Sequence, residues 1–482
     1  MILKKESTKL MFFTIAVALV GSAIFILHNI KAVKFNCFNV YDAAIYPQAL
    51  MEMATNLSLN PFTSLRNVKI LNDHFDPILI FMIPWVRLVK SNIIGIYLID
   101  IFWVWLTLML LASTQKRWST TAIIWSMLFL AKAIVYPLTH PMLTTTWSMF
   151  ACAWLIWSVH KKNSYAIFCS ALFLCLFREE YPFAIGTLSL FYLWKREWKL
   201  SIALIFISLA FLFFIFHLRP LVLGQVEHYG EGALKNLIIS PIDTLTKSFL
   251  ALDRGVFSIY YPFIPPFILL FLKGNREQLH QFKNNTLIPT LLFLLPLLTI
   301  RLIFQKFYFH YSVPIVITLI MLVALSEIPS LLLSYKKILY ITLLLFGLSA
   351  ASNYTKIFKL LIWNSSAKCI ITPEKELYTQ QLLKQFSMIS PNKTILATGG
   401  VAPQIVTPNK QLYHLGGIHA QLSQFDYLLL EKGEKTNIWP LQNSDVDKVI
   451  SACSQYISQT LSDNPYYLLV EGPFPSQCLD HL

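Results

Sequence analysis

A short stretch early in the sequence places acids and a base directly in front of an apolar run. In "LNDHFDPILIFMIP", residues 71–84, Asp73, His74 and Asp76 precede a run that begins at Pro77. Ionisable side chains at the edge of a bilayer are costly and usually serve a function. Carboxylates there can take a proton from an attacking hydroxyl, and an imidazole can bind or orient a polar group.

Further uncommon ionisable residues stand at the ends of other apolar runs. They are Asp42, Glu179, Glu180, Arg254, Arg301, Lys306 and His310. The topology derived below places all of them on one side of the membrane. Carboxylates together with cations suit either group transfer from a lipid-phosphate donor or the passage of a polar solute.

Taken singly, each of these residues also has a structural interpretation. Asp42 and Asp76 could cap helices, the latter in front of a proline at the first helical position. Either glutamate of the 179–180 pair could simply pair with Arg178. The cations at 301, 306 and 310 could be interfacial side chains that snorkel to the surface. The hypothesis of a polar site depends on their joint occurrence.

The composition predicts the class of protein that positions these residues. Of 482 residues, 56% are hydrophobic and 13% charged, against about 25% charged in an ordinary soluble protein. Apolar runs long enough to cross a bilayer recur along the chain. The formal charge of +14 comes mainly from short basic connections between these runs, which indicates orientation, not nucleic-acid binding.

Placing the basic connections inside predicts a polytopic α-helical membrane protein of about eleven transmembrane helices. The predicted spans are 10–30, 92–112, 119–137, 142–160, 164–177, 181–194, 199–218, 256–272, 286–303, 310–330 and 338–353. The first span is expected to remain as an anchor, because its apolar part is too long for a signal peptide. The run 77–90 is too short for this scheme and is expected to be re-entrant or interfacial.

This topology divides the chain into two predicted parts. Residues 1–354 form the transmembrane part with external loops 31–76 and 219–255, and the N-terminus is cytoplasmic. Residues 355–482 form a small external α/β domain. Its expected helices lie in "ELYTQQLLKQFSMI" and "DVDKVISACSQYISQTL", and its expected strands in "KTILAT", "FDYLLLEK" and "PYYLLVEG".

The seven cysteines divide according to the same topology. Cys152, Cys169 and Cys175 fall inside spans and are expected to pack as small apolar residues. Four others lie outside the spans. Cys453 and Cys478 are the pair most favoured for a disulfide, because both flank the last strand, although sequence alone does not fix connectivity.

Four blocks of the sequence resemble a known family. "FNVYDAAIYPQAL", "NDHFDPILIFMIPW", "FREEYPFAIG" and "FHYSVPIV" are similar to the blocks of a bacterial and archaeal family of predicted membrane proteins of unknown function, placed in the GT-C superfamily of glycosyltransferases. The positions that match the family pattern are Asp42, Gln48, His74, Phe75, Pro77, Glu179, Glu180, His310 and Tyr311. The likeness covers nearly the whole chain, including the C-terminal α/β segment.

The resemblance implies a GT-C-like fold in the plasma (inner) membrane and transfer of a sugar from a polyprenyl-phosphate donor, with inversion, to a lipid, glycan or protein acceptor. Asp42 would be the base, with Glu180 and His74 also catalytic. The phosphate would be held by Arg254, Arg301, Lys306 or His310. Gln48, Asp76, Glu179 and Tyr311 are expected to bind substrate.

Other interpretations remain open at this stage. A transporter or flippase for a polar lipid or glycolipid would have discontinuous helices in two related halves. A non-catalytic membrane protein would tolerate loss of the Asp42 carboxylate. No cofactor is firmly indicated, but Asp42, His74, Asp76 and Glu180 could supply ligands to a divalent metal ion.

Overall fold

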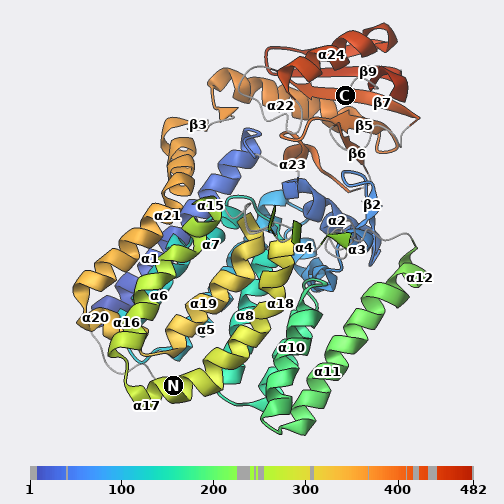
Figure 1. Cartoon of the computed structure of the whole chain (residues 1–482). Coiled ribbons are helices and arrows are strands. Elements are labelled where there is room, and N and C mark those ends of the chain that lie inside the picture. Colours follow the sequence, from blue (N-terminus) through green and yellow to red (C-terminus); the bar gives the residue numbers. More distant parts are fainter. Residues whose placement is uncertain are drawn as a thin grey trace.

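The chain is a helical bundle with a sheet domain at one end (Figure 1). The computed structural model describes residues 8–38, 42–224, 239–240, 242–243, 246–247, 254–303, 309–366, 369–408, 410–415, 423–432 and 442–479. Within these ranges, the structure describes only the backbone of residues 42, 254–256, 309–310, 366, 370 and 443.

In the described part of the chain, eleven helices or consecutive helix pairs, called passes below, make up the bundle. They are α1 (Thr8–Lys34), α5 (Ile93–Thr114), α6 with α7 (Trp118–Leu130 and Lys132–Leu138), α8 (Thr144–His160), α9 (Ser164–Leu174), α10 (Tyr181–Trp194), α11 with α12 (Trp198–Phe213 and Arg219–Leu223), α15 with α16 (Arg254–Tyr260 and Ile264–Lys273), α17 with α18 (Arg276–Phe282 and Ile288–Ile303), α19 with α20 (Val313–Leu325 and Ile328–Ser334) and α21 (Lys336–Trp363). Each predicted span coincides with one pass. The prediction of a polytopic helical fold is therefore confirmed.

The passes differ in length. Within the described residues, five helices are long and apolar enough to cross a membrane, or seven if each of two bent pairs is one span. The bends are 62° between α6 and α7 and 68° between α19 and α20. Polar caps define several of the helix starts: the side chains of Asn92 and Asn163 accept hydrogen bonds from the backbone of the first turns of α5 and α9.

The first connection, between α1 and α5, holds several short elements. They are α2 (Asp42–Asn56), β1 (Phe62–Thr63), β2 (Val68–Lys69), α3 (Ile70–Asp73), the 3-10 helix η1 (Pro77–Met82) and α4 (Ile83–Leu88). The run from 77 to 88 is thus a short apolar helical segment, in keeping with the expectation that it does not cross the membrane. Phe81 and Leu88 on it are exposed.

The C-terminal domain has a five-stranded mixed sheet of order β6-β5-β7-β9-β8. The strands are β5 (Thr394–Ala397), β6 (Gln411–His414), β7 (Gln424–Glu431), β8 (Gln459–Asp463) and β9 (Tyr467–Pro475). Strands β6, β5 and β7 are parallel, and β9 is antiparallel to both β7 and β8. The small α/β layer expected from the sequence is confirmed.

Alternate strand residues bury two different cores. Leu429 of β7 belongs to the core that includes α22 (Pro373–Met388) and the bundle, whereas Leu428 and Leu430 pack with α24 (Asn443–Cys453). The period-2 pattern of a strand places helices on both faces in this way. Strand β6 was not predicted. The helix expected to continue to 461 ends at Cys453, and the last three residues of that segment, 459–461, belong to strand β8 (Gln459–Asp463).

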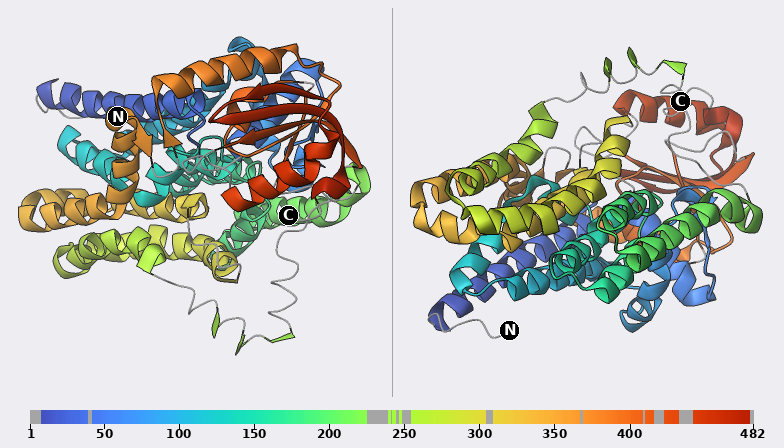
Figure 2. Two further views of the ribbon diagram at one scale, coloured as in Figure 1. Left: turned by 90° about the horizontal axis from the view of Figure 1, so that it is seen from above. Right: turned by 60° about the horizontal axis from the view of Figure 1, so that its bottom comes forward.

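The sheet domain lies over the first connection of the chain (Figure 2). Ser64 donates a hydrogen bond of 2.7 Å to the carbonyl of Leu412 in β6, and Asn36 donates one of 2.8 Å to the Tyr467 hydroxyl. A disulfide joins Cys37 to Cys369. The predicted Cys453–Cys478 disulfide is also present, whereas the Cys37–Cys369 pair was not predicted. Helix α21 runs through the predicted boundary at 354 and ends at Trp363.

Candidate functional site

The charged connections between the helices lie at two different ends of the bundle, because successive helices run in opposite directions. The α9–α10 turn, the C-terminal end of α18, the start of α19 and the first connection all lie at the end that carries the sheet domain (Figure 1). The basic turns between α5 and α6, α8 and α9, and α10 and α11 lie at the opposite end. Those of the acids and bases singled out in the sequence that the structure describes are therefore gathered at one end.

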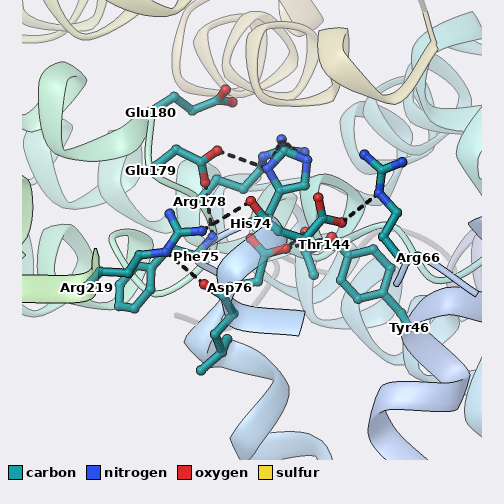
Figure 3. Close-up of polar contacts among 12 residues, drawn as sticks. Tyr46, Arg66, His74, Phe75, Asp76, Thr144, Arg178, Glu179, Glu180 and Arg219 are labelled. Atoms are coloured by element: carbon teal, nitrogen blue, oxygen red, sulfur yellow. Dashed lines mark hydrogen bonds and ion pairs between the residues drawn. The ribbon is translucent and has the colours of Figure 1, made fainter. Parts of the chain in front are cut away.

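His74 lies between a carboxylate and a guanidinium (Figure 3). Its Nδ1 donates a hydrogen bond of 2.9 Å to Glu179 Oε1, and Arg178 Nη2 lies 3.1 Å from Nδ1 and 3.2 Å from Nε2 of the ring. Glu179 Oε2 also accepts a hydrogen bond from the backbone N–H of Phe75. Backbone pairing of Ile78 N–H with the Leu176 carbonyl, at 2.9 Å, holds the two loops together.

The electrostatics of Glu179 follow from this arrangement. Burial disfavours its ionised form, but the His74 ring, its hydrogen bond and the Arg178 charge outweigh burial and hold the pKa of Glu179 well below its usual range. The residue is thus an ionised acceptor. The structural alternative, in which either glutamate of the pair simply pairs with Arg178, leaves out the hydrogen bonds of Glu179 to His74 and to the Phe75 backbone in the other loop.

Glu180 points to a different partner. It forms an ion pair with Arg301 of α18 in which both side chains are buried. Arg301 Nε also donates a hydrogen bond of 2.9 Å to the Tyr311 carbonyl. The Tyr311 ring lies 5.2 Å from the Arg301 guanidinium and 5.7 Å from that of Arg178. Arg301 is only 3% exposed, so its interpretation as a snorkelling side chain is wrong.

Asp76 is fully buried and does not cap a helix. Its Oδ2 accepts hydrogen bonds of 2.7 Å from the Tyr46 hydroxyl and 3.0 Å from Thr144, and the start of η1 has no side-chain cap. The capping interpretation is therefore wrong for this residue. Burial raises the pKa of Asp76 to about 6, against the opposing charges of Arg178 and His74.

A second buried arginine anchors the loop that carries His74. Arg219 of α12 is 1% exposed and donates hydrogen bonds to the carbonyls of Leu71 at 2.8 Å and Asp73 at 3.2 Å. The Asp73 carboxylate in turn accepts a bond of 3.4 Å from Arg66. These contacts fix the backbone just before His74.

Four predicted site residues have side chains that lie outside the described part. Asp42 begins α2 and Arg254 begins α15, at the end of the bundle that holds the cluster. His310 lies in the 3-10 helix η5 (Phe309–Ser312), directly before Tyr311. Lys306 falls outside the described residues altogether. The described contacts of the cluster come from the other predicted residues and from residues that were not predicted.

Gln48 is not part of the cluster. Its amide nitrogen donates to Ser64 at 2.8 Å and its oxygen accepts from the Leu65 backbone at 3.3 Å. The side chain, 2% exposed, ties α2 to the β1–β2 hairpin below the sheet domain.

Sequence reasoning did not identify Arg178, Arg219, Tyr46 or Thr144 as parts of the site. Arg178 adjoins the predicted glutamate pair, and Tyr46 lies four residues after Asp42. Their closeness in sequence to predicted site residues is the signal that could have identified Arg178 and Tyr46. Arg219 and Thr144 lie in separate helices, and no local pattern distinguishes them.

The described side chains do not form a metal site. Among the residues that the structure describes, no group of three histidine, cysteine, aspartate or glutamate side chains has the arrangement of a ligand set. His74 contacts Glu179 and Arg178, and Asp76 Oδ2 is occupied by Tyr46 and Thr144.

Comparison with known proteins relates this architecture to a solved structure. The crystal structure of ArnT from Cupriavidus metallidurans bound to undecaprenyl phosphate is similar over 97% of this chain and 98% of that chain, with a TM-score of 0.52 and 10% sequence identity. At this identity the likeness shows a shared fold. No curated protein matches the sequence. A family match covers residues 37–464, and the chain therefore belongs to the family described as "Predicted membrane protein (DUF2079)".

Proposed function

We propose that the protein is a GT-C-type glycosyltransferase that moves a sugar from a polyprenyl-phosphate donor to an acceptor hydroxyl at the external face of the membrane. One observation carries this proposal. Buried arginines and carboxylates gather at one end of a chain that is only 13% charged. The fold is shared with a protein whose structure contains undecaprenyl phosphate.

The cations of the cluster suit a lipid phosphate. Arg178 and Arg301 flank the Tyr311 ring and could each direct N–H groups at phosphate oxygens, because a guanidinium forks onto such oxygens better than an ammonium does. The Nε of Arg178 and the Oδ1 of Asp76 are buried without a hydrogen-bond partner among the described residues. Such orphan groups are uncommon in native proteins and favour an additional polar ligand or water.

Asp42 remains our proposed base. Its carboxylate would accept the proton of the acceptor hydroxyl while that oxygen forms a bond to the anomeric carbon. The bond from this carbon to the donor phosphate breaks, and polyprenyl phosphate leaves with the bonding electron pair. Attack from the face opposite the phosphate inverts the anomeric centre. His74 and Glu180 would assist Asp42 in catalysis, Glu180 through its ion pair with Arg301. Asp76 and Glu179 would bind sugar hydroxyls, and Arg254, Lys306 and His310 would add to the phosphate site.

Two features support an external location for this end of the bundle. The basic turns lie at the opposite end, which the positive-inside rule assigns to the cytoplasm. Both disulfides lie at the site end or in the sheet domain, and disulfides persist in oxidising compartments. Under this proposal residues 355–482 form an external domain above the membrane part, and the N-terminus is cytoplasmic.

The proposal is tested in cells by comparing surface glycans and glycolipids. A deletion strain is complemented with wild type, Asp42→Asn or a control, Glu52→Gln, which changes another acid of the same helix α2. Mass spectrometry of lipid, polysaccharide and glycoprotein fractions is expected to show one sugar missing from the deletion and Asp42→Asn strains. Wild type and Glu52→Gln should restore it.

The outcomes separate the transferase from its rivals. Full rescue by Asp42→Asn, at wild-type protein level, would contradict catalysis by this residue. If the protein were a flippase, the deletion strain would still make the glycosylated lipid, but the lipid would stay in the cytoplasmic leaflet. Leaflet-specific labelling of the lipid distinguishes that result from loss of the sugar linkage itself.

A further inference from the structure

A large pocket opens at the end of the bundle opposite the acid and base cluster. Its volume is about 1050 Å³, and it is lined by the turns after α5 and α8, by α17 and by the break between α19 and α20. Helix α17 lies across the lower end of the bundle (Figure 1). The proposed transfer reaction uses nothing at this end.

The pocket is strongly basic. Lys116, Arg117, Lys161 and Lys162 line it, and the one acid in its lining is Glu327. Glu327 accepts a hydrogen bond from the backbone of Asn275. None of the four cations forms an ion pair with an acid among the described residues. Four exposed cations around one hollow create a local field that attracts anions.

The floor of the pocket is fixed by hydrogen bonds between helices. His160 Nδ1 lies 2.9 Å from the Thr286 hydroxyl and joins α8 to the segment before α18. Gln115 donates a bond of 2.7 Å to the Ala324 carbonyl and joins the α5–α6 turn to the end of α19. The cationic turns are therefore held in place around the opening, which reduces the ordering cost of binding.

The lining also includes two buried apolar side chains, those of Leu270 and Phe282. Helix α16, which carries Leu270, also exposes apolar side chains: Phe271 and Leu272 are 60% and 73% exposed. A lipid could place a charged head group among the cations and its acyl chains along this apolar surface. Basic pockets between transmembrane helices at a cytoplasmic surface bind anionic lipid head groups in this manner.

We propose that this pocket binds the phosphate group of an anionic phospholipid from the leaflet that surrounds it. Under the proposed orientation this is the cytoplasmic leaflet, but the binding itself depends only on the pocket and a membrane surface. A soluble phosphate compound would present the same chemistry. The experiment therefore distinguishes the two sources.

The full-length protein is purified in detergent, and binding of short-chain phosphatidylglycerol is measured by native mass spectrometry and by titration. The pocket variant combines Lys116→Gln, Arg117→Gln and Lys161→Gln. A matched variant, Lys195→Gln, Arg196→Gln and Lys199→Gln, removes the same charge from the α10–α11 turn and the first turn of α11, at the same end of the bundle but outside the pocket. Thermal unfolding verifies that both variants fold. If the triple pocket variant does not fold, the single variant Lys161→Gln takes its place.

We expect wild type to prefer phosphatidylglycerol over zwitterionic phosphatidylcholine. The pocket variant should lose at least tenfold in affinity for phosphatidylglycerol, and the matched variant less than twofold. Unchanged binding by the pocket variant, or an equal loss in both variants, overturns the proposal. Competition by inorganic phosphate at concentrations similar to those of the lipid would keep the phosphate site but reject a lipid as its source.

Discussion

Arg301, near the C-terminal end of α18, and Glu180, just before α10, form a buried ion pair across the upper end of the bundle. The pair joins two helices that pack along much of their length and places a guanidinium beside Tyr311. It lies within hydrophobic surroundings, where charges are stable only with a partner. The dependence of each buried charge on the other gives the first prediction.

Arg301→Gln should destabilise the protein by about 3–5 kcal/mol, because the buried Glu180 carboxylate loses its direct ion-pair partner. The double variant Glu180→Gln/Arg301→Gln should recover most of that loss, since it removes both charges. Thermal unfolding of the purified protein in detergent measures both effects. Additive losses in the double variant would show that the two residues do not interact.

Asp76 should make stability depend on pH in an unusual direction. Its pKa is raised from 3.8 to about 6 in the folded protein, so between these values the folded state binds more protons than the unfolded state. Stability contributed by this group is present at low pH and lost as the pH rises from about 4 to 6, by up to about 3 kcal/mol.

Asp76→Asn provides the comparison for this second prediction. An amide resembles the protonated acid and does not titrate, so the variant should match wild type near pH 4 and be more stable than wild type at pH 7. The difference in melting temperature between the two proteins, followed across this range, isolates Asp76 from other carboxylates. A difference that does not change with pH contradicts the assignment.

Arg178→Lys should reduce transfer activity at least tenfold with little change in stability. A lysine keeps the charge but cannot both approach the His74 ring and lie beside Tyr311. Arg87→Lys is the control, because Arg87 is an exposed arginine of the first connection that contacts the Ala54 carbonyl. Restoration of the missing glycan in the deletion strain is the readout, and equal activity of both variants would argue against a role for Arg178.

The two disulfides predict how many thiols react. Alkylation of the denatured, unreduced protein should add three groups, at Cys152, Cys169 and Cys175, and alkylation after reduction should add seven. Intact-protein mass spectrometry counts them. Cys37→Ser with Cys369→Ser should lower stability by about 2–4 kcal/mol, because the disulfide closes a very long loop. Five reactive thiols without reduction would contradict one of the bridges.

Topology reporters test the proposed orientation. Alkaline phosphatase, which is active only outside the cytoplasm, should be active when fused after Gly224 or Asn364 and inactive when fused after Lys162 or Arg196. A fluorescent protein that folds only in the cytoplasm should give the opposite pattern. The reverse result would move the acid and base cluster to the cytoplasmic face and reject an external transferase.

The sequence by itself determined the layout of the chain. Apolar runs predicted each helical pass, because the length of a membrane helix follows from the thickness of the bilayer. Short apolar runs predicted β5, β7 and β9 as buried strands, and local blocks identified the loops of the candidate site. These properties depend on neighbouring residues, so they can be read without a structure.

Only the tertiary structure decided which side chains meet. It paired Glu180 with Arg301, His74 with Glu179, and Asp76 with Tyr46 and Thr144. It also joined Cys37 to Cys369, 332 residues away. Such contacts depend on how distant helices pack and on which side chains burial forces into partnership. Neither hydrophobic periodicity nor spacing along the chain contains that information.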